Sequence, residues 1–430
     1  MSEGDCYLRA IGEGVDPSGL PWAELEPGLL RARRSSIKWR RFPAEVLPMF
    51  VAEMDFAVAP EVRHAISGAV AASDIGYVEE IAPVAEAFAF FADNRWGWKV
   101  PTAGVRLTTD VATGVVESLR VGRPGGGRLV LSTPTYPGFF EMLEEVPFEV
   151  VELPLLDADA ALVGSLDPAA SVRRPARSAA SATLDLEAIA REFERGADAF
   201  ILCNPHNPHG VPFGRNELTA LAHLAAEHDV FVVSDEIHAP LTHSNAVFTP
   251  FAPIAAEAGA LSVTATSASK GWNLAGAKCS IIVAADERAN RLLEALPPEV
   301  HTRTSLLGVH ANIAAFTAGV DWLDRTVAQI EANQALFAEL VAQRLPGVEY
   351  RPGTTGYLAW IDLRRSGLGE HPTVEILDRA KVALNDGRDF GAGGAGHARV
   401  NLACAPDTIV RGIDRIAALL ASTATEGKTA

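Results

Sequence analysis

The sequence predicts an α/β protein with a mostly parallel central sheet, helices on both faces of that sheet, and a smaller α+β domain. Apolar, β-branched runs occur at residues 128–131, 200–203, 230–233, 261–264 and 279–283. Amphipathic helical stretches such as residues 217–224 separate them. Strands that are apolar on both faces and separated by helices are typical of parallel sheets covered on both sides.

The second domain is predicted from chain length and from a change of pattern. A chain of 430 residues with 48% hydrophobic content can bury a large core and normally divides into two domains. From about residue 311 the pattern changes to long helical sequence over 327–344, followed by a strand-like run at 357–362. Residues 157–183 are rich in Ala, Ser, Asp and Arg without sustained periodicity, which indicates a surface loop.

Charge and cysteine content limit the possible partners. The formal net charge is −17, which disfavours binding to nucleic acid and to anionic membrane surfaces. No apolar run approaches the ~18 residues that a membrane helix requires. The four cysteines lie far apart, which suits reduced thiols rather than a disulfide framework, so we expect a cytoplasmic protein.

Three predicted strands deliver polar residues into the loops that follow them. Asn207 lies in an Asn-Pro-rich turn, Asp235 ends the next apolar run, and Lys270 follows the hydroxyl-rich stretch 264–269. Ligands gather at the carboxyl ends of the strands in open parallel sheets, so we expect these side chains to meet. A buried carboxylate needs a cationic partner, and a lysine in this setting indicates carbonyl-amine chemistry.

Motifs around these residues resemble the fold-type I enzymes that use pyridoxal 5'-phosphate (PLP), the aminotransferase class I/II superfamily. Within that superfamily the chain is most similar to the PatB/MalY-like cysteine-S-conjugate β-lyases, which are relatives of cystathionine β-lyase. The resemblance covers about residues 38–406 in consistent order. The phrases that carry it are Lys38-Trp39, Leu47-Pro48-Met49-Phe50-Val51-Ala52-Glu53-Met54-Asp55-Phe56, Asn204-Pro205-His206-Asn207-Pro208, Ser234-Asp235-Glu236-Ile237-His238, Ser267-Ala268-Ser269-Lys270 and Trp322-Leu323-Asp324.

The resemblance implies roles around the cofactor ring. Lys270 would hold PLP covalently and later move the substrate Cα proton, which requires a depressed lysine pKa. Asp235 would pair with the pyridine nitrogen, and Asn207 would donate a hydrogen bond to the ring O3'. Tyr136 would stack on the ring, although a core tyrosine is nearly as good an interpretation without the resemblance. His238 is the best marker of the lyase branch and is expected close to the cofactor without a catalytic step.

The phosphate and the substrate carboxylate need further donors. Residues 113–119 have the pattern of a turn that opens a helix, so Gly114 and Val115 are our backbone candidates for the phosphate. By family position, Ser267 and Lys278 complete the phosphate cradle. Tyr77 resembles a tyrosine that reaches the phosphate from the neighbouring subunit, which implies a homodimer. Arg399 is placed like the arginine that binds the substrate carboxylate, and its alternative role is an ordinary ion pair.

We therefore expect residues 1–48 to pack beside the small domain, residues 49–300 to form the large PLP-binding domain, and residues 301–430 to form the small α+β domain. The lyase-like phrases favour β-elimination from a cysteine S-conjugate or cystathionine, which gives a thiol, pyruvate and ammonia. An aminotransferase, or a specialised variant with a different outcome, remains open. A non-enzymatic PLP-binding regulator would need a helix-turn-helix domain, for which the ~48 residues before the first motif are too few. We expect no metal.

Overall fold

A computed structural model describes residues 14–157 and 182–429, and its centre is a seven-stranded sheet. The strand order is β2-β10-β9-β8-β7-β3-β4, and only β10 runs antiparallel to its neighbours in this sheet. The strands are β2 (Val105–Thr108), β3 (Gly127–Thr133), β4 (Phe148–Pro154), β7 (Ala199–Cys203), β8 (Phe231–Asp235), β9 (Ser262–Thr266) and β10 (Ser280–Ala284). The predicted mostly parallel sheet is confirmed.

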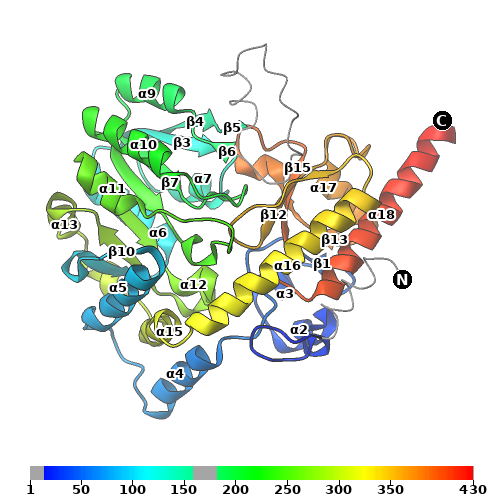
Figure 1. Ribbon diagram of the computed structural model, residues 1–430, viewed down its shortest axis with the longest axis horizontal. Coiled ribbons are helices and arrows are strands. Elements are labelled where there is room, and N and C mark those ends of the chain that lie inside the picture. The colour runs from blue at the N-terminus through cyan, green and yellow to red at the C-terminus, as the bar shows by residue number, and fades with distance from the viewer. Residues whose placement is uncertain (1–13, 158–181, 430) are drawn as a thin grey trace.

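Helices cover both faces of this sheet (Figure 1). Side chains alternate along each strand, so Phe231 and Val233 of β8 pack on one face while Val232 packs on the other. The first face is covered by α6 (Val111–Gly122), α7 (Gly138–Leu143) and α13 (Glu287–Leu293). The second face is covered by α9 (Leu186–Glu194), α10 (Arg215–Glu227) and α11 (Phe251–Ala258).

A third apolar cluster lies beside the β2 edge of the sheet. It is rich in aromatic side chains from α5 (Ala82–Trp96) and α15 (Leu306–Phe316), and α4 (Pro60–Ala71) packs against α15. The rings of Phe91 and Trp272 lie 5.5 Å apart between centroids, and those of Phe91 and Phe316 are also 5.5 Å apart. The segment that contains Lys270 is thereby anchored by the buried indole of Trp272 two residues later.

The C-terminal part forms a four-stranded antiparallel sheet with the order β11-β12-β15-β14. The strands are β11 (Glu349–Tyr350), β12 (Leu358–Asp362), β14 (Asn385–Asp386) and β15 (His397–Asn401). Two long helices, α16 (Val320–Arg344) and α18 (Pro406–Thr429), share an apolar cluster with one face of this sheet. Ala398 and Val400 of β15 point into that cluster, so Arg399 between them lies on the opposite face.

The N-terminal segment is tied to the C-terminal part of the chain. β1 (Leu47–Pro48) pairs in parallel with β13 (Val382–Ala383). Together with the separate sheets, this pairing supports the proposed division at residues 48 and 300, which stays a proposal. The shorter helices and strands are α2 (Pro27–Arg33), α3 (Ile37–Arg40), β5 (Leu156–Asp157), β6 (Ala182–Thr183), α12 (Ala268–Gly271), α14 (Pro298–Thr302) and α17 (Pro372–Glu375).

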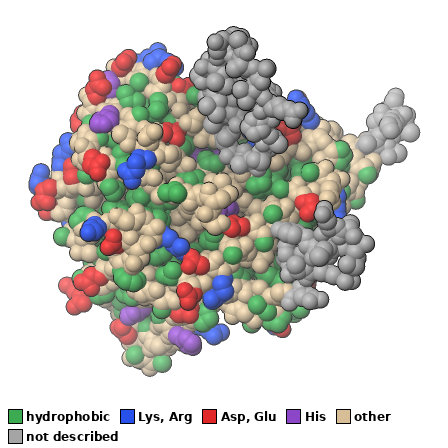
Figure 2. Space-filling view, viewed as in Figure 1, with side chains coloured by type: hydrophobic (Ala, Val, Ile, Leu, Met, Phe, Trp, Pro, Cys, Tyr) green, Lys and Arg blue, Asp and Glu red, His purple; other side chains and the backbone are tan. Residues whose placement is uncertain are grey.

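β5 and β6 pair as an antiparallel ribbon, and the predicted loop at 157–183 lies almost wholly outside the described residues. Within the described ranges, no single helix is long and apolar enough to cross a membrane. α15 and α16 meet that test only as a pair bent by 76°. On the face drawn in Figure 2, acidic and basic side chains are interspersed over the coloured surface rather than gathered by sign.

Candidate active site

A cavity of about 230 Å³ lies at the carboxyl ends of β7, β8 and β9. Because these strands are parallel, their ends meet at one edge of the sheet, as the sequence predicted. The predicted residues that line the cavity are Tyr136, Asn207, Asp235, His238, Lys270 and Lys278. Side chains that lie more than 140 positions apart in the sequence therefore converge on one volume.

Lys270 stands in the short helix α12, directly after β9. Its Nζ donates a hydrogen bond to the carbonyl oxygen of Ala52 at 3.0 Å. The pKa of Lys270 is lowered to about 8, mainly by burial and then by the charge of Arg399, while Asp235 and Glu53 oppose the shift. Near neutral pH a useful fraction of this amine is therefore uncharged, which a lysine needs in order to attack an aldehyde or to accept a proton.

Asp235 ends β8 with its carboxyl group buried in the cavity wall. Its Oδ1 accepts a hydrogen bond from the Ile237 backbone N–H at 3.1 Å. Burial raises the pKa of Asp235 to about 6, while the Ile237 N–H and the charge of Lys270 oppose that rise. Among the described residues no cationic group lies within ion-pair distance of Asp235, so the carboxylate is suited to a cationic group on a ligand.

Asn207 lines the cavity and is hydrogen-bonded to Arg399, which is not itself among the lining residues. Arg399 Nη1 donates to Asn207 Oδ1 at 3.1 Å, and both side chains are buried. Because an amide oxygen cannot donate, this bond fixes the orientation of the amide and leaves its NH2 group to donate elsewhere. The predicted donor role of Asn207 toward a ring oxygen is compatible with this orientation and stays a prediction.

Arg399 is buried without a carboxylate partner among the described residues. Its Nη2 donates to Asn385 Oδ1 at 2.7 Å, its Nε has no hydrogen-bond partner, and its guanidinium lies 5.0 Å from the centre of the Phe390 ring. Burial lowers the pKa of Arg399 to about 10. The ordinary ion pair that sequence reasoning left open is therefore absent from the described part of the chain, and the buried cation is suited to an anionic ligand.

His238 and Tyr136 complete the walls around Lys270. Burial, together with the charges of Lys270 and Arg399, lowers the pKa of His238 to about 3, so its ring is neutral at working pH. Tyr136 packs edge-on against Phe139, with ring centroids 5.5 Å apart, and 38% of its surface is exposed. A half-exposed aromatic ring that lines a cavity is free to contact a planar ligand.

The helix end at the cavity lies earlier in the sequence than predicted. α6 begins at Val111, and Asp110 caps it through a 2.9 Å bond from the Thr113 N–H to Asp110 Oδ1. The Gly114 N–H already donates to the Asp110 carbonyl oxygen at 3.0 Å, and Val115 lies one residue deeper in the helix. The prediction of Gly114 and Val115 as free donors is therefore wrong. Val111 and Ala112 line the cavity instead, in the first turn, whose N–H groups have no intrahelical partners.

Ser267 does not face the cavity either. Its hydroxyl donates to the Cys279 carbonyl oxygen at 2.7 Å and accepts from the Ser269 N–H at 3.0 Å, so it caps α12. The prediction of a ligand-facing Ser267 is not compatible with this arrangement, because its only proton is already donated. Ser269 lines the cavity in its place.

Lys278 lines the cavity and forms an ion pair with Asp110, with Nζ and Oδ2 2.8 Å apart. The Lys278 side chain is 57% exposed, and exposed pairs of this kind contribute only about 0–1 kcal/mol. The lysine can therefore exchange this partner for an anionic ligand at little cost. Lys278 and the N–H groups of Val111 and Ala112 form the cationic end of the cavity, and the Asp110 carboxylate partly neutralises it.

Tyr77 lies outside the cavity, between α4 and α5, and is 90% exposed. Its proposed reach into a neighbouring subunit stays a prediction. Sequence reasoning missed Asp110, Ser269, Asn385 and the backbone of Ala52. The Asp110-x-x-Thr113 spacing is a recognisable helix start and could have located the first turn of α6.

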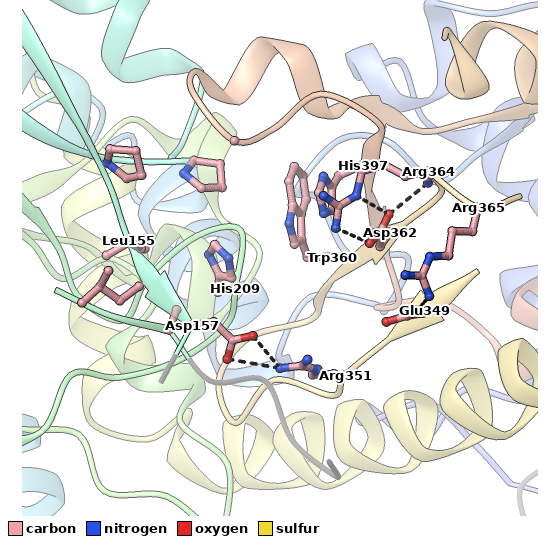
Figure 3. A pocket seen from close by; sticks show the side chains of 15 residues that line it. Leu155, Asp157, His209, Glu349, Arg351, Trp360, Asp362, Arg364, Arg365 and His397 are labelled. Atoms are coloured by element: carbon pink, nitrogen blue, oxygen red, sulfur yellow. Dashed lines mark hydrogen bonds and ion pairs between the residues drawn. The ribbon is translucent and has the colours of Figure 1, made fainter. Parts of the chain in front are cut away.

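A second, larger cavity of about 780 Å³ lies where the two sheets face each other (Figure 3). Its described lining shares no residue with the first cavity and contains neither lysine nor cysteine. Trp360 and His397 stack at 5.1 Å between ring centroids. Its three arginines pair with three carboxylates: Arg351 with Asp157, Arg364 with Asp362 and Arg365 with Glu349. The smaller cavity, in which the Lys270 amine and the Asp235 carboxyl lie together without an ion-pair partner among the described residues, is therefore the candidate active site.

Comparisons with known proteins agree with this geometry. The model of the family "Aminotransferase class I and II" matches residues 101–416. A Mycobacterium leprae protein whose name assigns it provisionally as a cystathionine beta-lyase is 38% identical over 89% of this chain and 94% of its own. Cystathionine beta-lyase PatB of Bacillus subtilis is 30% identical over 91% of this chain and 98% of its own.

Among solved structures, the PLP-bound C-S lyase of Staphylococcus hominis superposes with a TM-score of 0.78 at 25% identity. That match covers 87% of this chain and 89% of the other. The fold is that of the fold-type I transferases, as predicted. The chain belongs to the aminotransferase class I and II family.

Proposed function

We propose that this chain is a PLP-dependent carbon–sulfur β-lyase. The observation that carries the proposal is the meeting, in one cavity, of the Lys270 amine with the buried Asp235 carboxylate, which has no cationic partner among the described residues. The names of the relatives support the lyase branch, since PatB is a cystathionine beta-lyase and the Staphylococcus hominis protein is a C-S lyase.

The residues present fit PLP at each of its polar ends. Lys270 would hold the aldehyde carbon, and Asp235 would face the protonated ring nitrogen. The Asn207 NH2 group would donate to the ring oxygen, because its Oδ1 is occupied by Arg399. The first-turn N–H groups of α6 and Lys278 would hold the phosphate.

When bound, PLP supplies an electron-withdrawing ring that stabilises negative charge at the Cα of an amino acid. The protein contributes orientation and proton transfer. Arg399, which carries an unpaired Nε, binds the substrate carboxylate and fixes the amino acid in the cavity. Lys270 takes the Cα proton, for which its lowered pKa leaves a neutral fraction. The Asp235 carboxylate would keep a proton on the ring nitrogen.

We infer a cysteine thioether as substrate, either cystathionine or another cysteine S-conjugate. Water is consumed and the Cβ–S bond is cleaved, so the products are a thiol, pyruvate and ammonia. To test this, the protein is supplied with cystathionine or S-methylcysteine, and thiol and pyruvate are measured. Lys270→Ala serves as control and should abolish both products. Amination of an added keto acid without thiol release would reverse the assignment in favour of an aminotransferase, the second candidate, which the family model supports.

We further propose a homodimer in which Tyr77 contributes to the partner's cavity. Support comes from exposed apolar side chains between α4 and α5, where Ile75 is 61% exposed and Tyr77 is 90% exposed. A cytoplasmic location is supported by Cys203, Cys279 and Cys404, which are free and buried.

A further inference from the structure

The carbonyl oxygen of Ala52 accepts hydrogen bonds from two side chains of different elements. Lys270 Nζ lies 3.0 Å from it, and Tyr357 Oη lies 3.1 Å from it. Lys270 comes from α12, Tyr357 directly precedes β12, and Ala52 lies in the segment that follows β1. Both lone-pair positions of this carbonyl are thereby used.

The Ala52 carbonyl is held in place by its neighbours. Asn401 Nδ2 donates to the carbonyl oxygens of Val51 at 2.7 Å and Glu53 at 2.6 Å. Lys38 Nζ also donates to the Glu53 carbonyl oxygen, at 2.9 Å. With both flanking peptide groups anchored, the Ala52 carbonyl is not free to turn away from Lys270.

Tyr357 is a fixed and neutral donor. Its side chain is 0% exposed, and its backbone oxygen accepts from the Leu402 N–H at 2.8 Å. Burial raises the pKa of the Tyr357 hydroxyl well above its ordinary value, so it stays protonated at every working pH. Its hydroxyl therefore donates to Ala52 at all times and limits how strongly that carbonyl can bind the Lys270 ammonium.

We propose that Tyr357 is a positioning residue for Lys270. By donating to the shared Ala52 carbonyl, it weakens the hydrogen bond that holds the lysine ammonium at the cavity wall whenever that amine is not bonded to the cofactor. The role in catalysis rests on the proposed function, but the hydrogen-bond arrangement does not. The other charged or titratable groups that face Lys270 are Asp235, Glu53, Arg399 and His238. All four groups are retained in Tyr357→Phe, so the variant removes only the hydroxyl that donates to Ala52.

The test is Tyr357→Phe in the full-length, cofactor-free chain. Without the tyrosine hydroxyl, the Ala52 carbonyl oxygen accepts a hydrogen bond from Lys270 only. That bond then becomes stronger and favours the ammonium form of the lysine. We expect the pH midpoint of Lys270 acetylation, followed by peptide mass mapping, to rise by about 0.5 to 1, which corresponds to one neutral hydrogen bond. The exposed Lys99 serves as internal reference for reagent reactivity.

Tyr350→Phe is the matched control, because the Tyr350 hydroxyl is also buried but has no hydrogen-bond partner among the described residues. Circular dichroism verifies that both variants fold. The inference would be overturned if the pH midpoint of Lys270 acetylation did not rise in Tyr357→Phe. It would also be overturned if that midpoint rose equally in Tyr350→Phe. Failure of PLP to bond to Lys270 would instead overturn the proposed function and leave this titration unaffected, so the two failures are distinguishable.

Discussion

Asp235, Arg399 and Lys270 are ionisable side chains that are buried without a partner of opposite charge in the described part of the chain, and this burial lowers the stability of the ligand-free fold. Among the described residues, Asp235 is a buried carboxyl with no cation within ion-pair distance, and Arg399 is a buried guanidinium with no anionic partner. Lys270 has a pKa of about 8 because burial disfavours its charge. Groups so placed destabilise the ligand-free fold and are typical of sites in which the ligand completes the electrostatics.

Asp235→Asn is expected to stabilise the cofactor-free chain near pH 7 while it abolishes lyase activity. The folded-state pKa of about 6 exceeds the ordinary value of 3.8, so the folded chain holds this proton more tightly and loses stability as pH rises from about 4 to 6. The difference between these two pKa values corresponds to about 3 kcal/mol of lost stability at pH 7, and an uncharged asparagine does not incur this loss. Urea unfolding of both proteins at pH 7 and at pH 4 measures the difference.

The stabilisation should shrink as pH falls toward 4, because wild-type Asp235 is then neutral as well. A variant that is equally stabilised at both pH values, or destabilised at pH 7, would show that the carboxyl is not strained as we describe.

Among the secondary-structure elements, the buried strands of the large sheet were predicted best from the sequence, because burial alone determines their apolar pattern. The runs that became β3, β7, β8, β9 and β10 are apolar on both faces, and such runs tolerate few alternatives. The junction residues Asn207, Asp235 and Lys270 followed from those strands, since parallel ends share an edge. The prediction of the phosphate donors was wrong because it depends on the residue at which α6 begins. The Asp110 cap sets that start at Val111, three residues before Gly114.

Contacts that depend on distant segments were beyond sequence reasoning. The Ser267 hydroxyl donates to the carbonyl oxygen of Cys279, a residue that directly precedes β10. Asn385 orients Arg399 from the adjacent strand β14 and lies in no motif that we recognised. Ala52 contacts Lys270 through its backbone carbonyl oxygen, so its side chain gives no indication of this contact in the sequence.

Asp110→Asn should retain the cap of α6 yet strengthen PLP binding several-fold. Asparagine caps helices about as well as aspartate, whereas the removed charge no longer opposes a phosphate or occupies Lys278. The rate of PLP loss on dilution, followed by absorbance, measures the effect. Asp110→Ala is the control, since it also removes the charge but should lower stability by about 1 kcal/mol. Faster PLP loss from Asp110→Asn would contradict this account of the cationic end.

For the whole molecule, the fold brings two sheets and an N-terminal segment together at one cavity. Asp235 ends strand β8 of the large sheet, Lys270 follows strand β9 in α12, and Ala52 lies in the segment after β1. Arg399 of the small sheet bonds to Asn207, which lines the cavity. The site therefore forms only when all three parts are assembled. The proposed homodimer would add a fourth contribution through Tyr77.

Tyr77→Phe is expected to release PLP faster without changing the oligomeric state, because a single hydroxyl would contact the partner's phosphate while the apolar surface around it is retained. PLP retention after gel filtration, with light scattering on the eluted peak, measures both quantities. Unchanged retention in a verified dimer would remove Tyr77 from the site, and a monomeric wild-type protein would refute the shared site altogether.

The covalent role of Lys270 can be tested by reducing the PLP-loaded protein with borohydride and mapping the labelled peptide by mass spectrometry. Borohydride fixes a C=N bond between a lysine amine and an aldehyde as a stable secondary amine. We predict one label, on Lys270. A label on Lys278 or another lysine, or no label in protein that retains PLP, would contradict it.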